Sequence, residues 1–203
     1  AVGAVLRRRP EGIVRAYIDA QRKSDFGFLM KELASRRVAY RLLPAEELAR
    51  VAGSHHHEGV CVLARPRPQP SLEGWIASCP PAACAVVLDG VENPHNLGAI
   101  LRTAAHFGVR GVWVVGRAAT HGATARVAEG GAEVVDVFDV GSAVPVLLAL
   151  ARAGFHIVGA AAGRGTSLFE HRLHRRTAFV LGAEHAGLSA EAARLVELEM
   201  HIP

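Results

Sequence analysis

The stretch Asp89 to Gly108, DGVENPHNLGAILRTAAHFG, decides how the second half of this chain folds. It follows the apolar run Cys84 to Leu88 (CAVVL), which is typical of a buried strand. Asn93-Pro94 marks a turn, and Gly108 stands where a helix C-cap is expected. Between them, apolar residues recur at the spacing of one helix face, namely Leu97, Ile100, Leu101 and Ala104. We therefore predict a strand, a polar loop and a helix over residues 96–107.

Two polar residues in this stretch are candidates for a functional site. Open α/β sheets bind ligands beyond the carboxyl ends of their strands, which is where a strand leads into a polar loop. We expect Asn96 to lie at that strand-to-helix loop, where the helix begins, and Arg102 to emerge from the helix at the rim of a cleft. The pattern alone leaves a plainer interpretation equally open, in which Asn96 is a helix N-cap and Arg102 is a solvated arginine.

The chain is predicted to hold two domains separated by a proline-rich segment. The first third alternates helices and strands, with strands expected at 13–19, 38–43 and 59–64. Arg65 to Pro70 (RPRPQP) cannot form a helix or a central strand and predicts a stiff linker. We assign residues 1–66 to a first domain, 67–82 to the linker and 83–203 to a second domain.

The second domain is predicted to be a parallel sheet with helices on both faces, because strands and helices alternate along it. Its expected elements are strand 84–88, helix 96–107, strand 111–115, helix 123–128, strand 133–137, helix 143–153, strands 156–161 and 177–181, helix 189–195 and strand 198–202. The glycine fingerprint of a dinucleotide-binding domain is missing after the first strand, which excludes a nicotinamide-dependent oxidoreductase. Gly159 to Gly165 (GAAAGRG) lacks the features of a P-loop, so its glycines are expected to turn tightly or to let backbone approach a flat ligand.

The composition further narrows the classes of protein to which the chain could belong. Half of the 203 residues are hydrophobic, yet no apolar run approaches the ~20 residues of a membrane span and no secretory signal is visible. The three cysteines lack metal-binding spacing and indicate a reduced cytoplasmic setting. His55 to His57 do not share a helix face, and we assign no metal site. Residues 1–75 carry 13 Lys and Arg against 8 Asp and Glu, which favours attraction to a polyanion.

Three segments of the chain resemble the motifs of one enzyme family. Residues 89–108 are similar to motif 1 of the SpoU (TrmH-type) RNA ribose 2′-O-methyltransferases of the SPOUT superfamily. Phe179 to Ser189 (FVLGAEHAGLS) is similar to motif 2, and His201-Ile202-Pro203 to the opening of motif 3. Thr120 to Glu133 (THGATARVAEGGAE) resembles a proteobacterial branch of tRNA/rRNA methyltransferases. The first third resembles the small ribosomal-protein-like RNA-binding domain that precedes such catalytic domains.

The resemblance implies a fold class and a function. The fold would be α/β, with a small N-terminal RNA-binding domain and a parallel-sheet SPOUT domain ending in a trefoil knot that is incomplete in this sequence. The activity would transfer a methyl group from S-adenosyl-L-methionine to a ribose 2′-OH of rRNA or tRNA, in a cytoplasmic homodimer without membrane association. The alternative is a non-catalytic RNA-binding scaffold with the same fold.

The resemblance also implies roles for individual residues. Asn96, Arg102 and Glu184 would form the catalytic set, and the planar fork of Arg102 suits a phosphate of the RNA. Asn96 would orient Arg102 or bond the ribose, unless it is a structural loop amide, and Glu184 would shape the motif 2 loop, unless it is an ordinary glutamate at a helix N-terminus. The adenosine of the cofactor would be surrounded by three residues at family motif positions, namely Leu181, Gly182 and Ile202. Two alanines at the end of the preceding strand, Ala160 and Ala161, would join them on the basis of their position alone.

The sequence departs from the family pattern at its end. Motif 3 normally continues past Ile-Pro into a Ser-Leu-Asn-Val-Ser segment and a final apolar helix, and this sequence stops at Pro203. We expect a further tail to carry them. The sequence also starts at Ala1 without Met, within what resembles a helix, and we expect residues upstream of it.

Overall fold

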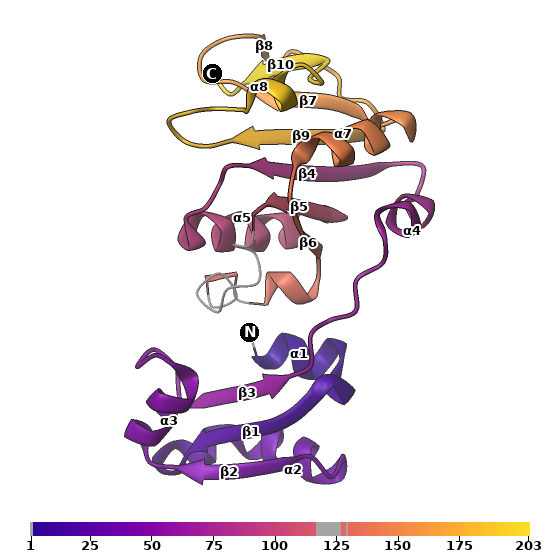
Figure 1. Cartoon of the computed structure of the whole chain (residues 1–203). Coiled ribbons are helices and arrows are strands. Elements are labelled where there is room, and N and C mark those ends of the chain that lie inside the picture. Colours follow the sequence, from indigo (N-terminus) through magenta and orange to yellow (C-terminus); the bar gives the residue numbers. More distant parts are fainter. Residues whose placement is uncertain (1, 117–126, 129) are drawn as a thin grey trace. The chain divides into compact units, whose positions relative to one another are not determined.

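The computed structural model describes residues 2–116, 127–128 and 130–203 of the chain. It contains two compact units, an N-terminal unit of residues 1–68 and a C-terminal unit of residues 69–203 (Figure 1). Among the described residues, no helix combines the length and the apolar character that crossing a bilayer requires.

The N-terminal unit is a three-stranded sheet with the strand order β2-β1-β3. The central strand β1 runs parallel to β2 and antiparallel to β3. The predicted alternation of helices and strands is confirmed here. The elements in chain order are α1 (Val2–Arg8), η1 (Pro10–Gly12), β1 (Ile13–Asp19), η2 (Ala20–Phe26), α2 (Gly27–Ser35), β2 (Ala39–Leu43), α3 (Ala45–Ala52) and β3 (Val60–Ala64).

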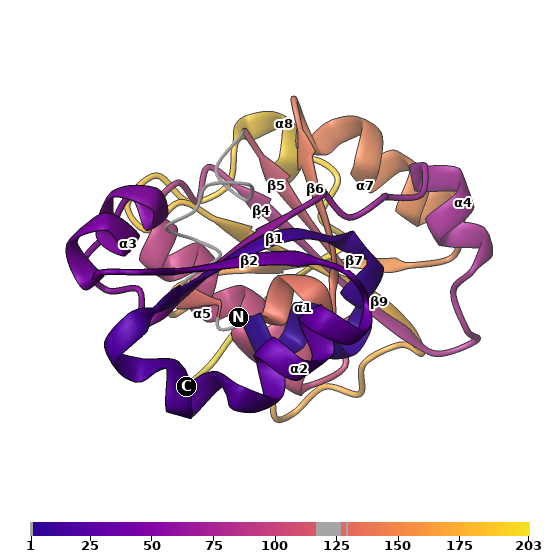
Figure 2. The same ribbon diagram turned by 90° about the horizontal axis from the view of Figure 1, so that it is seen from below.

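Helices α1 and α2 lie on the same side of this sheet, as the view along it shows (Figure 2). The sheet side chains that pack against them are Ile13, Ala16 and Ile18, which are buried. Helix α3 begins after Pro44 with Glu46 and Glu47 in its first turn, where carboxylates suit the helix dipole. It ends at Gly53, whose φ of 63° is the left-handed conformation that glycine adopts without strain.

The C-terminal unit is built on a seven-stranded sheet with the order β6-β5-β4-β9-β7-β10-β8. Every strand pair in it is parallel, as the alternating pattern predicts. The elements in chain order are α4 (Leu72–Ala77), β4 (Ala83–Asp89), α5 (Pro94–His106), β5 (Gly111–Val115), η3 (Gly131–Glu133), β6 (Asp136–Val140), α7 (Ala143–Arg152), β7 (His156–Ala160), β8 (Thr166–Ser167), β9 (Arg176–Gly182), α8 (Ala190–Ala193) and β10 (Leu198–His201).

Several elements differ from the sequence-based expectation. Residues 133–137 are not one strand, because a 3-10 turn ends at Glu133 and the strand β6 spans 136–140. The helix expected at 123–128 falls almost entirely outside the described residues. The stretch assigned to the linker contains helix α4, which Ser71 caps by accepting a hydrogen bond from the Gly74 N–H. The two-residue strand β8 has no signal in the hydrophobic pattern.

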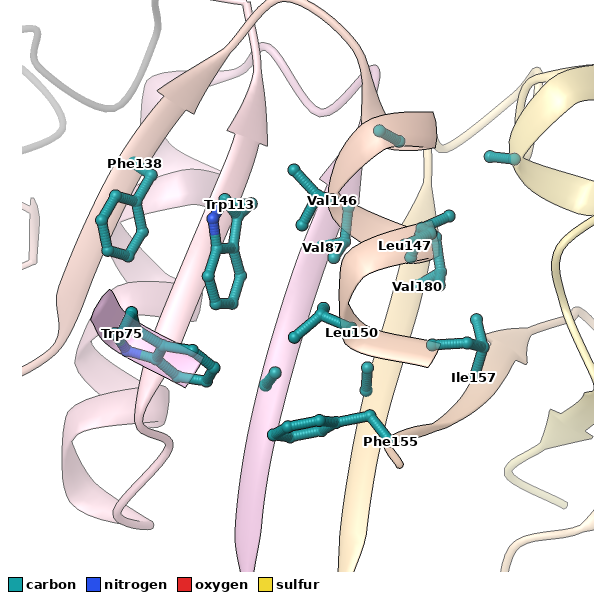
Figure 3. Packing of buried hydrophobic residues seen from close by; sticks show 14 of the residues in the cluster. Trp75, Val87, Trp113, Phe138, Val146, Leu147, Leu150, Phe155, Ile157 and Val180 are labelled. Carbon is teal, nitrogen blue, oxygen red and sulfur yellow. The ribbon is translucent and has the colours of Figure 1, made fainter. Parts of the chain in front are cut away.

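Aromatic residues explain why α4 belongs to the C-terminal unit. Trp75 is fully buried, lies edge-on to Trp113 at 4.6 Å between ring centroids, and is 6.0 Å from Phe155 (Figure 3). Trp113 in turn stacks on Phe138 at 5.0 Å. The indole N–H of Trp75 donates to the Arg110 carbonyl at 3.4 Å, so its polar atom is satisfied as well. Trp75 thereby anchors the segment that follows the proline-rich stretch.

The two faces of the seven-stranded sheet carry separate cores. One core lies between the sheet and helices α4, α7 and α8, and the other between the sheet and α5 with the segment around η3 (Figure 2). Strand β4 contributes to both, because Val87 enters the first core and Leu88 the second. Both side chains are fully buried, as expected of a central parallel strand.

Strand β10 is inserted between two strands that precede it in the sequence. Strand β10 lies between β7 and β8, so the connection of residues 161–165 from β7 to β8 spans across β10. The crossing is tight, because a Cβ on Gly165 would lie 2.3 Å from the carbonyl oxygen of Glu199, and Gly165 has a φ of 84°. The glycine-rich segment therefore lets the backbone pass close to strand β10. The sequence had also left open the possibility that these glycines approach a flat ligand.

Replacing Trp75 by alanine should destabilise the C-terminal unit. The substitution leaves a large cavity among Trp113 and Phe155, and buried Trp-to-Ala changes cost about 3–5 kcal/mol. Urea denaturation followed by circular dichroism measures the loss, with Phe107→Ala as the control because that side chain is 76% exposed. Equal stability of the two variants would contradict the packing described.

Candidate active site

The first part of the site lies where β4 leads into α5. Asn93 is the helix N-cap, since its side-chain oxygen accepts a hydrogen bond from the His95 N–H at 2.9 Å, and Pro94 occupies the first helical position. Asn96 therefore lies in the first turn of α5 and is exposed. The helix thus begins two residues earlier than expected, so Asn96 lies within its first turn rather than at the loop, and its alternative role as the N-cap is taken by Asn93.

The second part of the site lies at the end of β9. After Gly182 the chain makes a narrow turn, closed by two backbone hydrogen bonds between Ala183 and Gly187 at 2.9 and 2.8 Å. Glu184 is exposed within this turn, and helix α8 begins only at Ala190. The alternative interpretation of Glu184 as a helix N-terminal residue is therefore wrong.

Gly182 is required by this turn itself. A Cβ at Gly182 would lie 2.1 Å from the carbonyl carbon of Gly187, a distance that no side chain tolerates. The missing side chain thus allows the loop to fold back on the strand end. The expected close approach of a cofactor is not needed to explain this glycine.

A buried carboxylate that the sequence analysis missed joins the two parts. Asp89 ends β4, is 8% exposed, and accepts a hydrogen bond from the Ser189 N–H at 2.8 Å. Asp89 is also paired in register with Gly182 on the neighbouring strand. The signal was available, because an aspartate that ends an otherwise apolar central strand needs a polar partner. The hydrogen bond from the Ser189 N–H to Asp89 fixes the end of the motif 2 loop.

A pocket of about 350 Å³ opens between α5 and the end of β9. Four residues predicted for the site line it, namely Asn96, Leu181, Gly182 and Glu184, and the remaining lining residues are Val91, Ala99 and Ile100. The amide of Asn96 and the carboxylate of Glu184 thus face the same space as an apolar wall. Such a wall with a few polar groups is typical of small-molecule sites.

Arg102 is exposed on α5 and is not among the pocket-lining residues in the described part of the chain. Six residues turn a helix by roughly 240° beyond one full turn, so Arg102 and Asn96 occupy different sides of α5. The backbone of Arg102 faces η3, since a Cβ on Gly131 would lie 3.1 Å from the Arg102 Cα. Arg102 is therefore placed beside the pocket rather than in its wall.

The other residues expected at the cofactor lie beyond β9, at the ends of the next two strands of the sheet, β7 and β10. Ala160 ends β7 and is exposed, while Ala161 donates its backbone N–H to the Met200 carbonyl at 2.8 Å. Ile202 follows β10 and is 73% exposed. These three residues share the carboxyl edge of the sheet with the pocket but do not line it. Among the described residues, no cluster of three or more His, Cys, Asp or Glu side chains could hold a metal ion.

Comparison with known families matches both units. The model of the SpoU rRNA Methylase family matches residues 83–203. The model described as RNA 2′-O ribose methyltransferase substrate binding matches residues 1–70.

Curated relatives align over almost the whole chain. The uncharacterized tRNA/rRNA methyltransferase YfiF of Escherichia coli O157:H7 is 37% identical over 195 residues, which are 96% of this chain and 56% of the relative. A Haemophilus influenzae relative of similar name is 35% identical, and the chain covers 51% of it, so this chain spans about half the length of these two relatives. The 23S rRNA (guanosine-2′-O-)-methyltransferase RlmB of Nitrosomonas europaea is 34% identical, with 100% of this chain and 80% of the relative covered.

Solved structures share the fold at low sequence identity. The SpoU methyltransferase AviRb from Streptomyces viridochromogenes, in complex with its cofactor AdoMet, has a TM-score of 0.80 at 18% identity and covers 100% of this chain and 77% of that one. An AdoMet-bound rRNA methyltransferase from Sinorhizobium meliloti has a TM-score of 0.76 at 19% identity, with coverage of 100% and 76%. The fold expectation of a parallel-sheet SPOUT domain behind a small α/β domain is thus confirmed, and the chain belongs to the SpoU rRNA methylase family.

Proposed function

We propose that this chain is an S-adenosyl-L-methionine-dependent RNA methyltransferase that modifies a ribose 2′-OH of rRNA or tRNA. The observation that carries the proposal is the pocket at the carboxyl edge, which gathers Asn96 and Glu184 from segments that are 88 residues apart. The relatives that are named for 2′-O-methylation of 23S rRNA support the reaction. The AdoMet bound in two of the structural neighbours supports the cofactor.

The residues at the edge fit the proposed cofactor. The pocket volume of about 350 Å³ lies within the ~300–1,000 Å³ of ordinary ligand sites. Leu181 and Ile100 offer an apolar wall to a flat adenine, and exposed Ala160 and Ile202 extend the same edge. When bound, S-adenosyl-L-methionine supplies an electrophilic methyl group. The chain itself must hold the ribose hydroxyl in line with that methyl group and support the charge that develops as the proton leaves.

Three side chains are proposed for these tasks. Arg102 binds the phosphate that flanks the target ribose, because its planar guanidinium matches phosphate with two hydrogen bonds and stays protonated. Its place beside the pocket suits a contact to RNA rather than to the adenosine. Asn96, inside the pocket, orients the ribose, and Glu184 shapes the motif 2 loop that borders the same pocket. The unpaired state of all three cysteines supports action in the reducing cytoplasm.

We further propose that the C-terminal unit forms a homodimer. Phe169 is 77% exposed and follows β8, while Ile202 follows the adjacent strand β10. Large apolar side chains that gather at an edge are typical of protein interfaces. Sedimentation velocity at micromolar concentration should therefore show a dimer. Phe169→Glu should shift it toward monomer, whereas Phe28→Glu in the N-terminal unit, at a site 72% exposed, should not. A monomeric wild-type chain would contradict the proposal.

Asp89→Ala should impair methyl transfer by releasing the motif 2 loop. The variant leaves the Ser189 N–H without its acceptor and removes a buried carboxylate, and the loss of a hydrogen bond to a charged group costs about 1.5–3 kcal/mol. We expect KM for the cofactor to rise, because Glu184 and Leu181 lie on the same loop and strand end. Steady-state kinetics check this, and Asp89→Asn, which retains an acceptor oxygen, should fall between the alanine variant and wild type. Unchanged kinetics for Asp89→Ala would contradict the role of this hydrogen bond.

Arg102→Ala should nearly abolish methyl transfer while sparing cofactor affinity. Removing one group that stabilises transition-state charge costs about 100- to 1,000-fold in rate, and Arg102→Lys should also be poor because a point charge cannot copy the fork. Radiolabelled methyl transfer gives the rate, and calorimetry gives the cofactor affinity. The matched control is Arg152→Ala, which removes an exposed arginine from the last turn of α7.

Two outcomes would overturn this assignment. Retention of more than about a tenth of wild-type activity in Arg102→Ala would make Arg102 a solvated helix arginine, since a transition-state contact is worth far more. RNA binding by the wild-type chain without any methyl transfer would instead favour the non-catalytic scaffold.

A further inference from the structure

Helices α1 and α2 cover one face of the sheet in the N-terminal unit, and the opposite face is not covered by them. Side chains alternate along a strand, so the neighbours of buried Ala16 and Ile18 point away from these helices. Those neighbours are Arg15 and Tyr17. Figure 2 shows α1 and α2 together on the other side of β1 and β2.

Strand register brings further side chains to the same side. Tyr17 is paired with Arg41 on β2 and with Cys61 on β3, and Arg15 is paired with Leu63. Paired residues on neighbouring strands point to the same face of a sheet. Arg15, Arg41 and Leu63 are exposed, and Tyr17 is partly exposed. An aromatic ring on the central strand is thus flanked by two arginines and an apolar side chain.

Helix α3 turns one end of this face into a groove. The groove has a volume of about 380 Å³ and is lined by Tyr17, Arg41, Leu43, Glu47, Arg50 and Val51. In the part of the chain that the structure describes, the side chains of Arg41 and Arg50 form no ion pair. One carboxylate, that of Glu47, opposes them. The unit as a whole carries 13 Lys and Arg against 7 Asp and Glu within residues 1–68.

We propose that this open face binds an unpaired nucleotide of the RNA substrate. Its base stacks on Tyr17, and Arg15, Arg41 and Arg50 contact the flanking phosphates. The proposal rests on the RNA-directed function proposed above and names the surface that would serve it. An unpaired nucleotide is chosen because a base inside a duplex does not expose its face, whereas a splayed base can stack on an aromatic ring beside a basic groove.

The test measures the affinity of the full chain for a labelled single-stranded oligoribonucleotide across a salt series. Tyr17→Leu keeps apolar bulk on the strand but removes the aromatic face, and we expect affinity to fall roughly 5- to 150-fold. Tyr17→Phe should bind within about 2-fold of wild type, since the ring and not the hydroxyl carries the stacking. Circular dichroism verifies that both variants fold.

The arginines are tested through the salt dependence. Arg41→Ala with Arg50→Ala should lower the slope of log affinity against log salt by about 1.4, because each phosphate contact to a single strand contributes ~0.7. The matched control, Arg8→Ala with Lys31→Ala, removes the same charge from exposed positions on α1 and α2 and should leave the slope unchanged. Glu47→Gln should tighten binding, because it removes the opposing carboxylate from the groove.

The outcomes separate this inference from the proposed function. Three results would overturn the inference while leaving methyl transfer intact. The first is an equal loss of salt slope in both double variants, and the second is undiminished RNA affinity in Tyr17→Leu. The third is a preference of the wild-type chain for duplex over single-stranded RNA. A different result would overturn the proposed function and support the RNA-binding face. The wild-type chain would then transfer no methyl group, and Tyr17→Leu would still lower its affinity for RNA.

Discussion

The parallel pairing of β4 with β9 is the constraint on which the site depends. Seven residue pairs hold the two strands in register, and the last of them sets Asp89 beside Gly182. Both strand ends therefore stop at the same level, so the helix that leaves one and the loop that leaves the other enclose a common space. A shift of one residue would reverse the direction of the side chains and take Asp89 away from the Ser189 N–H. The hydrogen bond between them then fixes a loop that secondary structure alone leaves free.

Much of the fold could be predicted because its signals are local. The apolar run before Asp89 and the periodic helix after Pro94 gave the strand and helix of motif 1, and Gly108 lies just past that helix with a φ of 71°. The errors arose where two local signals compete. Asn93 and Asn96 are both good caps, and the proline at the first helical position decides for Asn93. Residues 133–137 contain apolar residues at strand spacing, yet a 3-10 turn occupies the first of them and moves the strand three positions on.

The site was predictable in part, for the same reason. Its polar members come from segments that the family motifs mark, and Asn96 and Glu184 do meet in one pocket. Asp89 escaped notice because its importance lies in a partner 100 residues away. The packing role of Gly182 was not predicted, since only the folded loop shows that Gly187 fills the space beside it. The basic balance of the first third indicated a polyanion, but only strand register shows which arginines share a face with Tyr17.

The insertion of β10 has a consequence for how the chain acquires its structure. Strand β10 is the last strand in sequence, yet it takes an interior place between β7 and β8. During synthesis the earlier strands emerge first, so the connection of residues 161–165 must stay open until β10 arrives. Pairing before that moment would close the gap, and β7 and β8 would have to separate again to admit β10. The order of events, and not only the final energy, thus limits how fast this sheet can be completed.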